Sequence, residues 1–327
     1  MEPEVTVNRS IFDFCYEIDK YTYILANTPY VKCALLYLLI MLLSVVTICG
    51  NLLVIISIIY FKQLHTPTNH LVLSLAVADL FVGIFVFPFS MTFSFSLCMN
   101  SSNLFCEIRG SFDITLTACS ILNLCCISVD RYYAVCQPLT YKAKITHRVV
   151  VIMIIVSWGV SALIGISVVV SRINNEKCEE SCLVKVLMAN TIGPIFAFYL
   201  PMMILLCIYL KIFLVAQRQA RSIHNTTCQS TKSGATVSKM ERKAAKTLAT
   251  VLGIFLLCWT PFFLFAIIQP FTSVPVTVVE AIYWLGLSNS MLNPFIYAFF
   301  YSWFRAAFRM IISGKIFQGD FANIILH

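Results

Sequence analysis

Long apolar stretches without a charged residue are the main feature of this chain. Five charge-free stretches contain 23 to 33 residues each. Two more apolar stretches, 70–95 and 104–129, hold an acid in their interior, Asp79 in the first and Asp113 in the second. A helix needs about 20 residues to cross a hydrocarbon core of about 30 Å. The pattern therefore predicts seven transmembrane spans, at 34–60, 69–95, 104–136, 149–170, 187–216, 242–269 and 277–300.

These spans are expected to be helices, because backbone in lipid must satisfy its own hydrogen bonds and the alternation typical of barrel strands is absent. The predicted fold is an all-α membrane protein, a seven-transmembrane helix bundle at 34–301. An extracellular tail at 1–33 precedes it. At 302–313, apolar residues share one face and arginines another, which predicts a short amphipathic helix in the membrane interface. A cytoplasmic tail at 314–327 follows.

Composition and charge agree with a membrane protein. Hydrophobic residues make up 59% of the 327, charged residues 12%, and the mean hydropathy is +0.86; soluble domains have about 25% charged residues. With the N-terminus outside, the inner segments carry a net +13 and the outer ones −3, as the positive-inside rule requires. The excess of basic residues thus indicates topology in the plasma membrane rather than nucleic-acid binding. The first span is expected to act as the signal anchor.

The outer segments carry candidate modification sites. Asn8 and Asn100 each begin an Asn-x-Ser acceptor pattern for glycans. Five cysteines face the oxidising side: Cys15, Cys98, Cys106, Cys178 and Cys182. One arrangement, Cys106–Cys182 with Cys15–Cys178, would fix the second outer loop and the N-terminal tail over the bundle, although spacing alone leaves the connectivity open.

Asp79 lies near the middle of the second span, where an ionisable residue indicates function. Polar residues of other spans have similar depth, namely Asn51, Ser120, Asn289, Ser290 and Asn293. A single carboxylate with hydroxyl and amide oxygens suits a small hard cation such as sodium, or a structural polar network with trapped water. We therefore predict an allosteric sodium ion here. No other metal or cofactor is expected.

Asp113 lies about two turns inside the outer end of the third span. An uncompensated carboxylate there costs several kcal/mol, so a cationic ligand entering from outside is the expected partner. Aromatic residues of the sixth and seventh spans could surround an ammonium group and add cation–π attraction; they are Trp259, Phe262, Phe263, Tyr283 and Trp284. Ordinary core packing is the alternative explanation for each aromatic residue. The combination favours an amine pocket.

The cytoplasmic ends of the third and sixth spans hold opposite charges. Asp130-Arg131-Tyr132 ends the third span, and Glu241 begins the sixth. A contact between Arg131 and Glu241 would hold these ends together, and breaking it would open a cytoplasmic cleft; an exposed pair of little energetic value is the alternative. Pro201, Pro261 and Pro294 interrupt the last three spans and supply pivots.

These motifs together resemble those of rhodopsin-class G protein-coupled receptors over residues 34–312. They occur in the family's order: Gly50-Asn51, Leu75 to Asp79, Asp130-Arg131-Tyr132, Trp158, Pro201 with Tyr209, Cys258 to Pro261, and Asn293-Pro294 to Tyr297. The resemblance implies that Asp113 anchors an amine, that Pro201, Ile121 and Phe255 relay activation, and that Tyr209 and Tyr297 swing inward. It also adds Ile114, Thr117 and Leu287 to the candidate pocket.

A narrower resemblance, to trace amine-associated receptors, comes from Asn289 to Pro294, Tyr297 and Tyr301 to Phe304, and from the cysteines Cys15, Cys178 and Cys182. It implies small amines sensed largely in olfactory neurons, a heterotrimeric G protein of the stimulatory type, a rise in cyclic AMP, and arrestin as a further partner. The sequence departs from other amine receptors at Leu287, where most have a tyrosine that hydrogen-bonds the anchoring aspartate.

Two other functions remain as alternatives. A serotonin-like neurotransmitter receptor fits the same motifs. An amine transporter would require paired broken helices and an internal repeat, which the sequence does not show. An enzyme is not expected, because the five histidines lack metal-ligand spacing and no phosphate-binding loop is present. Gly193, Pro194 and Ala197 in the fifth span favour an apolar monoamine over a catecholamine or a polyamine.

Overall fold

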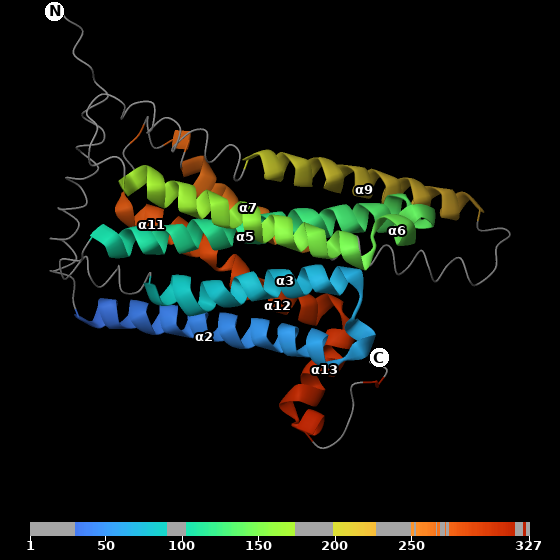
Figure 1. Ribbon diagram of the computed structural model, residues 1–327, viewed down its shortest axis with the longest axis horizontal. Helices are drawn as coiled ribbons and strands as arrows, with labels where there is room; N and C mark the ends of the chain where they lie inside the picture. Colours follow the sequence, from blue (N-terminus) through green and yellow to red (C-terminus); the bar gives the residue numbers. More distant parts are fainter. Residues whose placement is uncertain are drawn as a thin grey trace, which may run out of the picture.

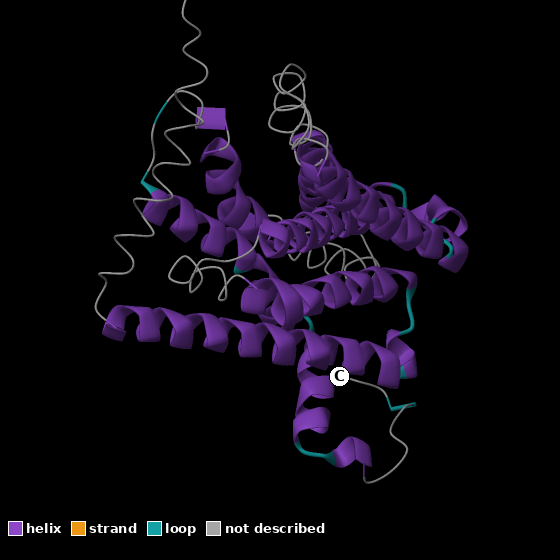
Figure 2. Cartoon of the chain, turned by 60° about the vertical axis from the view of Figure 1, so that its left-hand side comes forward, coloured by secondary structure: helices purple, strands orange, loops and turns teal. Residues whose placement is uncertain are grey.

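The computed structural model describes residues 30–89, 103–173, 199–226, 250–251, 253–265, 267–268, 272, 275–317 and 323–324. Within these ranges the chain is helical and contains no strand (Figure 2). The main helices are α2 (Tyr30–Tyr60), α3 (Pro67–Phe81), α5 (Asn103–Cys136), α7 (His147–Ile173), α9 (Leu200–Thr226), α11 (Val276–Leu287), α12 (Asn289–Phe300) and α13 (Ser302–Ile312). Shorter elements are η1 (Lys62–Leu64), η2 (Val82–Val86), α6 (Pro138–Lys144) and η6 (Lys315–Phe317).

Four helices among the described residues are long and apolar enough to cross a membrane: Tyr37–Tyr60, Pro67–Phe89, Ser111–Cys136 and His147–Ser167. Two shorter apolar helices, Leu200–Ile212 and Gly253–Phe265, lie within the predicted fifth and sixth spans. The all-helical class and the first four spans are thereby confirmed. The complete set of seven spans and the assigned domain limits stay predictions.

Helix α5 occupies the centre of the bundle (Figure 1). It packs against α3, α7 and α9. Helix α2 packs against α3 and α12, and α13 turns away from the bundle after crossing α2. Asp113 and Asp130 therefore both lie on the central helix of the bundle.

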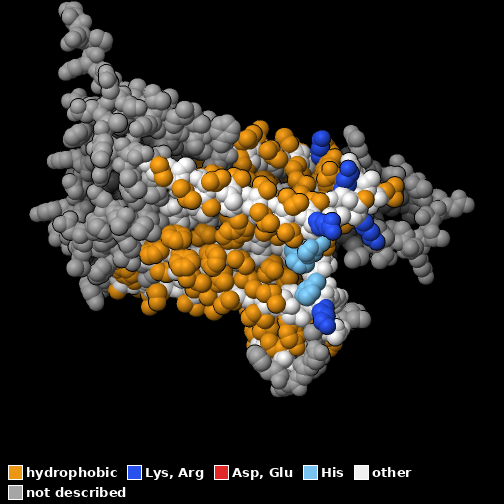
Figure 3. Space-filling model, viewed as in Figure 1, with side chains coloured by type: hydrophobic (Ala, Val, Ile, Leu, Met, Phe, Trp, Pro, Cys, Tyr) orange, Lys and Arg blue, Asp and Glu red, His pale blue; other side chains and the backbone are white. Residues whose placement is uncertain are grey.

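The outer surface of the bundle is apolar. Leu38, Leu163 and Leu257 are each 68–69% exposed, which water-soluble proteins do not tolerate over a whole surface. On the face drawn in Figure 3, hydrophobic side chains cover the middle, while lysine, arginine and histidine gather toward one end. This distribution is the one expected for an apolar belt in lipid with a basic cytoplasmic end.

The sequence pattern predicts the last transmembrane segment as a single span at 277–300. In the structure this segment is divided into two helices. A turn at Ser288 separates α11 from α12, and its hydroxyl donates to the carbonyl of Leu285 at 2.6 Å. Pro294 lacks the N–H that would reach the carbonyl of Ser290. The side-chain Nδ2 of Asn51 donates to that carbonyl instead, at 3.1 Å. Asn51 thus ties α2 to α12 where proline weakens the helix.

The fifth helix extends further toward the C-terminus than predicted. Helix α9 continues to Thr226, whereas the sequence placed the start of the inner loop at 217. Residues 216–221 are alanine, glutamine and arginine, which are strong helix formers even outside an apolar environment. Loss of hydrophobicity therefore marked the end of the apolar segment and not the end of the helix.

Candidate ligand pocket and activation contacts

Asp113 receives hydrogen bonds from two helices. The side chain is half-buried on α5. The phenol of Tyr283 on α11 donates to its Oδ2 at 2.9 Å, and the hydroxyl of Thr117, one turn further along α5, donates to its Oδ1 at 3.4 Å. The sequence predicted Tyr283 only as an aromatic residue that lines the pocket. Its polar contact with the carboxylate was missed.

The predicted aromatic residues form one continuous group beside this carboxylate. The ring of Trp259 lies 5.8 Å from Phe262 and 5.9 Å from Phe263. Phe262 lies 6.0 Å from Tyr283, and Tyr283 lies 6.1 Å from Trp284. These separations are those of packed aromatic pairs. Tyr283, which also donates to Asp113, connects the carboxylate to this group, and aromatic ring faces attract cations.

Gly286 allows this group to pack closely. A Cβ atom at Gly286 would lie 3.0 Å from the indole of Trp259, so only glycine leaves room for the ring against α11. Leu287 follows and is 1% exposed, in the core rather than at an open surface. Ile114, half-buried on α5, takes no part in the ring contacts and hydrogen bonds of the described residues.

Phe87 joins the aromatic group, a contact that the sequence did not predict. Its ring stacks on Trp284 at 5.8 Å and 26°, and its side chain is fully buried. It follows directly after η2, a π-helical turn. A π-turn changes which residue faces inward, so helical periodicity gave no signal for Phe87.

The sequence also offers a cation close to Asp113. Arg109 precedes Asp113 by four residues on α5, which places both on one face of the helix. Its side chain lies outside the described residues. Any test of Asp113 therefore requires a matched change at Arg109.

Asp79 is fully buried and bridges three helices. Its Oδ1 accepts a hydrogen bond from Ser120 of α5 at 3.1 Å, and its Oδ2 accepts one from Asn293 of α12 at 2.7 Å. The structure thus brings together three of the residues predicted for the sodium site.

Two amide oxygen atoms of α12 are suited to a cation or to water. Oδ1 of Asn289 and Oδ1 of Asn293 are buried and have no hydrogen-bond partner among the described residues. A buried polar atom without a partner costs about 1–3 kcal/mol. Carboxylate, hydroxyl and amide oxygens are the donors that a hard cation prefers. The residues therefore fit the predicted ion as well as they fit trapped water.

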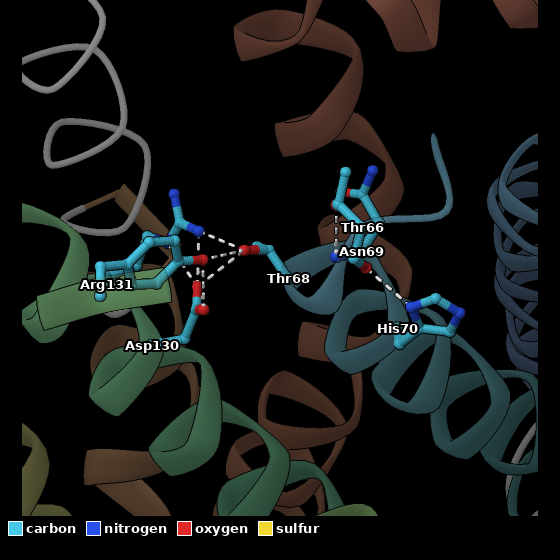
Figure 4. Close-up of polar contacts among 7 residues, drawn as sticks. Thr66, Thr68, Asn69, His70, Asp130 and Arg131 are labelled. Carbon is cyan, nitrogen blue, oxygen red and sulfur yellow. Dashed lines mark hydrogen bonds and ion pairs between the residues drawn. The ribbon is translucent and has the colours of Figure 1, made fainter. Parts of the chain in front are cut away.

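A second acidic group lies at the cytoplasmic end of α5. Asp130 is fully buried, and its Oδ2 accepts from Arg131 Nη2 at 2.5 Å and from Thr68 of α3 at 2.9 Å. Its Oδ1 accepts from the phenol of Tyr141 of α6 at 2.9 Å. Arg131 also donates to Thr68. Figure 4 shows Thr68 directed toward Asp130 and Arg131.

Neither Thr68 nor Tyr141 was predicted to contact this group. Burial, more than the nearby Asp130 charge, raises the pKa of the Tyr141 phenol. Tyr141 therefore stays protonated at neutral pH and continues to donate its hydrogen bond. We call Thr68, Asp130, Arg131 and Tyr141 the cytoplasmic cluster.

The remaining activation residues are placed as follows. Phe255 and Tyr297 are buried, with Ile121, in one hydrophobic core, and Tyr132 and Tyr209 are half-buried against it. Pro294 is buried in α12, and Pro261 is half-buried in the Gly253–Phe265 helix. Glu241, the predicted partner of Arg131, lies outside the described residues. So do the side chain of Cys106, the cysteines Cys15, Cys178 and Cys182, and the acceptors Asn8 and Asn100.

Comparison with known proteins identifies the family. The family model for the 7 transmembrane receptor (rhodopsin family) matches residues 50–297. Trace amine-associated receptor 1 of Macaca mulatta is 43% identical, with 94% of this chain and 96% of the relative covered. Trace amine-associated receptor 4 of Mus musculus is 42% identical, with 92% and 91% covered. This chain belongs to the trace amine-associated receptors.

Membership has direct consequences for this receptor. It is a G protein-coupled receptor in a membrane and not an enzyme. A small-molecule ligand and a G protein are the partners of this family. The predicted resemblance is thereby confirmed.

Proposed function

We propose that this receptor binds small, protonated, largely apolar monoamines through Asp113. The observation that carries the proposal is a carboxylate held between α5 and α11 beside a continuous group of aromatic rings. An ammonium group gains a charge-assisted hydrogen bond from the carboxylate. It gains about 0.5–2 kcal/mol more from each well-placed ring face. The names of the relatives agree with this ligand class.

Binding of the amine is proposed to shift the receptor toward an open cytoplasmic state. The ligand must bind that state more tightly than the closed one. Trp259, packed on Phe262 and Phe263, is the first inward contact, and Phe255 and Tyr297 lie in the core beyond it. The output is a stimulatory G protein and cyclic AMP, in olfactory neurons, with arrestin and membrane lipid as further partners.

The proposed setting is the plasma membrane with the N-terminus outside. The charge asymmetry of the loops supports this orientation. Glycans at Asn8 and Asn100, and disulfides Cys106–Cys182 and Cys15–Cys178, belong to the same proposal because all these residues fall on the outer side.

A sodium ion at Asp79 is proposed as an allosteric ligand. Ser120, Asn289 and Asn293 would complete the site with oxygen atoms. The ion would supply a positive charge to a fully buried carboxylate whose described hydrogen bonds come from the neutral groups of Ser120 and Asn293. Because Asn289 and Asn293 belong to α12, the site would couple the second and third spans to the seventh.

Replacement of Asp113 by asparagine tests the amine anchor. The side chain keeps its shape but loses its charge, so amine potency in cells with a cyclic AMP reporter should fall at least 100-fold, since a buried charge pair contributes about 3 kcal/mol or more. Surface expression, measured on an N-terminal epitope, should stay near that of the unchanged receptor.

Arg109→Gln is the matched control on the same helix face. It should leave the order of potencies across an amine panel unchanged. An Asp113→Asn receptor that reaches the surface and responds with undiminished potency would overturn the proposal.

A further inference from the structure

The phenol that holds Asp113 comes from an unexpected position on α11. Most amine receptors resembling this chain have the aspartate-binding tyrosine where Leu287 stands. Here Tyr283, four residues earlier, donates to Asp113 Oδ2 at 2.9 Å. Leu287 has no polar group and is 1% exposed.

Positions 283 and 287 lie on the same helix face, one turn apart. Four residues span about 6 Å of helix, and α11 runs inward from Val276. The phenol therefore reaches the carboxylate from about one turn nearer the outside than a tyrosine at 287 would. Thr117 approaches the other carboxylate oxygen from one turn further inward on α5.

The ring of Tyr283 is fixed at three points. Its hydroxyl is held by Asp113, and its ring lies between Phe262, at 6.0 Å, and Trp284, at 6.1 Å. Trp284 is itself stacked on the buried Phe87. A ring held in this way has little freedom to swing aside for a large ligand.

We propose that Tyr283 is both the positioning residue for the Asp113 carboxylate and the residue that limits the width of the amine. Its phenol orients the carboxylate, and its ring closes the outer side of the pocket above it. This inference rests on the proposed amine site. The accepted ligand class is slender amines, whose carbon skeleton passes beneath the ring of Tyr283.

Tyr283→Phe and Tyr283→Ala separate the two roles. The probes are pentylamine, which is unbranched, and adamantan-1-ylmethylamine, which is bulky, both measured by cyclic AMP response. Loss of a hydrogen bond to a charged group reduces binding about tenfold or more, so Tyr283→Phe should lower the potency of pentylamine by about tenfold. Tyr283→Ala should in addition raise the potency of the bulky amine relative to pentylamine.

Moving the phenol from position 283 to position 287 tests whether amine potency can be rescued. Tyr283→Ala combined with Leu287→Tyr should recover the potency of pentylamine, because the carboxylate again has a phenol partner. It should still accept the bulky amine, because the outer ring is gone. A merely structural role for Tyr283 would instead lower both potencies alike.

The failures of the two proposals are distinguishable. If Asp113→Asn abolishes the response but both Tyr283 variants keep the potency and the order of the two amines, the amine site stands and the role of Tyr283 is overturned. If Asp113→Asn leaves the response intact, the amine site itself is overturned.

Discussion

Two aspartates on one helix, Asp113 and Asp130, have opposite surroundings. Asp130 is fully buried and contacts a guanidinium as well as two hydroxyls. Asp113 is half-buried, and neutral hydroxyls of Tyr283 and Thr117 donate to it. Among the described contacts, the carboxylate at the cytoplasmic end has a guanidinium partner, whereas the hydrogen bonds to the carboxylate at the outer end come from hydroxyl groups.

This difference agrees with a structural ion pair at Asp130 and with the proposed ligand anchor at Asp113. A hydroxyl lowers the cost of a partly buried carboxylate but leaves its charge in place, so attraction for a cation persists. A guanidinium within the chain cancels the charge and makes the pair part of the packing. In the proposed function, the same residue type serves ligand binding at one end of α5 and stability at the other.

Removal of Asp130 should have the largest effect on stability. Asp130→Ala leaves Arg131 without its partner in a mostly buried position, which costs about 3–5 kcal/mol. Thermal unfolding of the purified receptor in detergent should show a large decrease in Tm. Asp113→Ala, the matched change on the same helix, should lower Tm much less. Equal decreases would remove the distinction between the two aspartates.

The packing beside Asp113 can be tested at Gly165 of α7. The hydroxyl of Ser111 donates to its carbonyl at 3.2 Å, and a Cβ atom at Gly165 would overlap the hydroxyl of Thr115. Gly165→Ala should therefore separate α5 from α7 and destabilise the receptor by about 1–3 kcal/mol. Gly159→Ala on the same helix meets no atom within 4 Å and should be neutral or slightly stabilising. Similar Tm values for both variants would contradict the close packing.

Loss of one hydroxyl in the cytoplasmic cluster should have a smaller effect. Tyr141→Phe removes the hydrogen bond to Asp130 at 2.9 Å and should cost about 1 kcal/mol. Ligand-free cyclic AMP should rise, because the closed arrangement is weakened. Tyr133→Phe, at a half-buried tyrosine of α5, is the control and should change neither quantity. Unchanged basal signalling in Tyr141→Phe would separate this cluster from activation.

The smallest effect is expected at Thr117. Its hydrogen bond to Asp113 is long, 3.4 Å, and such bonds are weak. Thr117→Val preserves the shape of the side chain and should change amine potency by less than about threefold, given an average of about 0.6 kcal/mol for a hydrogen bond within a membrane. A loss as large as that of Tyr283→Phe would show that both hydroxyls orient the carboxylate equally.

Hydropathy predicts the positions of the helices because a segment that crosses lipid must be long and apolar. The third span was predicted at 104–136, and α5 runs Asn103–Cys136. The seventh was predicted to end at 300, and α12 ends at Phe300. The length of an apolar segment predicts such limits. It fails for α9, where the helix continues beyond the apolar segment to Thr226.

Partners of the acidic groups were harder to predict. Thr68 lies 62 residues from Asp130 along the chain, and a threonine hydroxyl has no pattern that reveals its contact. Tyr283 was within reach of sequence reasoning, because it shares a helix face with Leu287 and can replace the phenol missing there. Because the aromatic residues were considered only as apolar pocket lining, the hydrogen bond from Tyr283 to Asp113 was not predicted.

The π-helical turn η2 has a consequence for how the pocket can change. One extra residue in a helical turn rotates everything after it by about 100°. In this receptor that rotation delivers Phe87 to Trp284. A single deletion between Val82 and Val86 would thus present a different side chain to the pocket wall while every other contact residue kept its identity. Insertions and deletions in this turn are therefore a route by which such receptors can acquire new ligand preferences without substitution of any residue that touches the ligand.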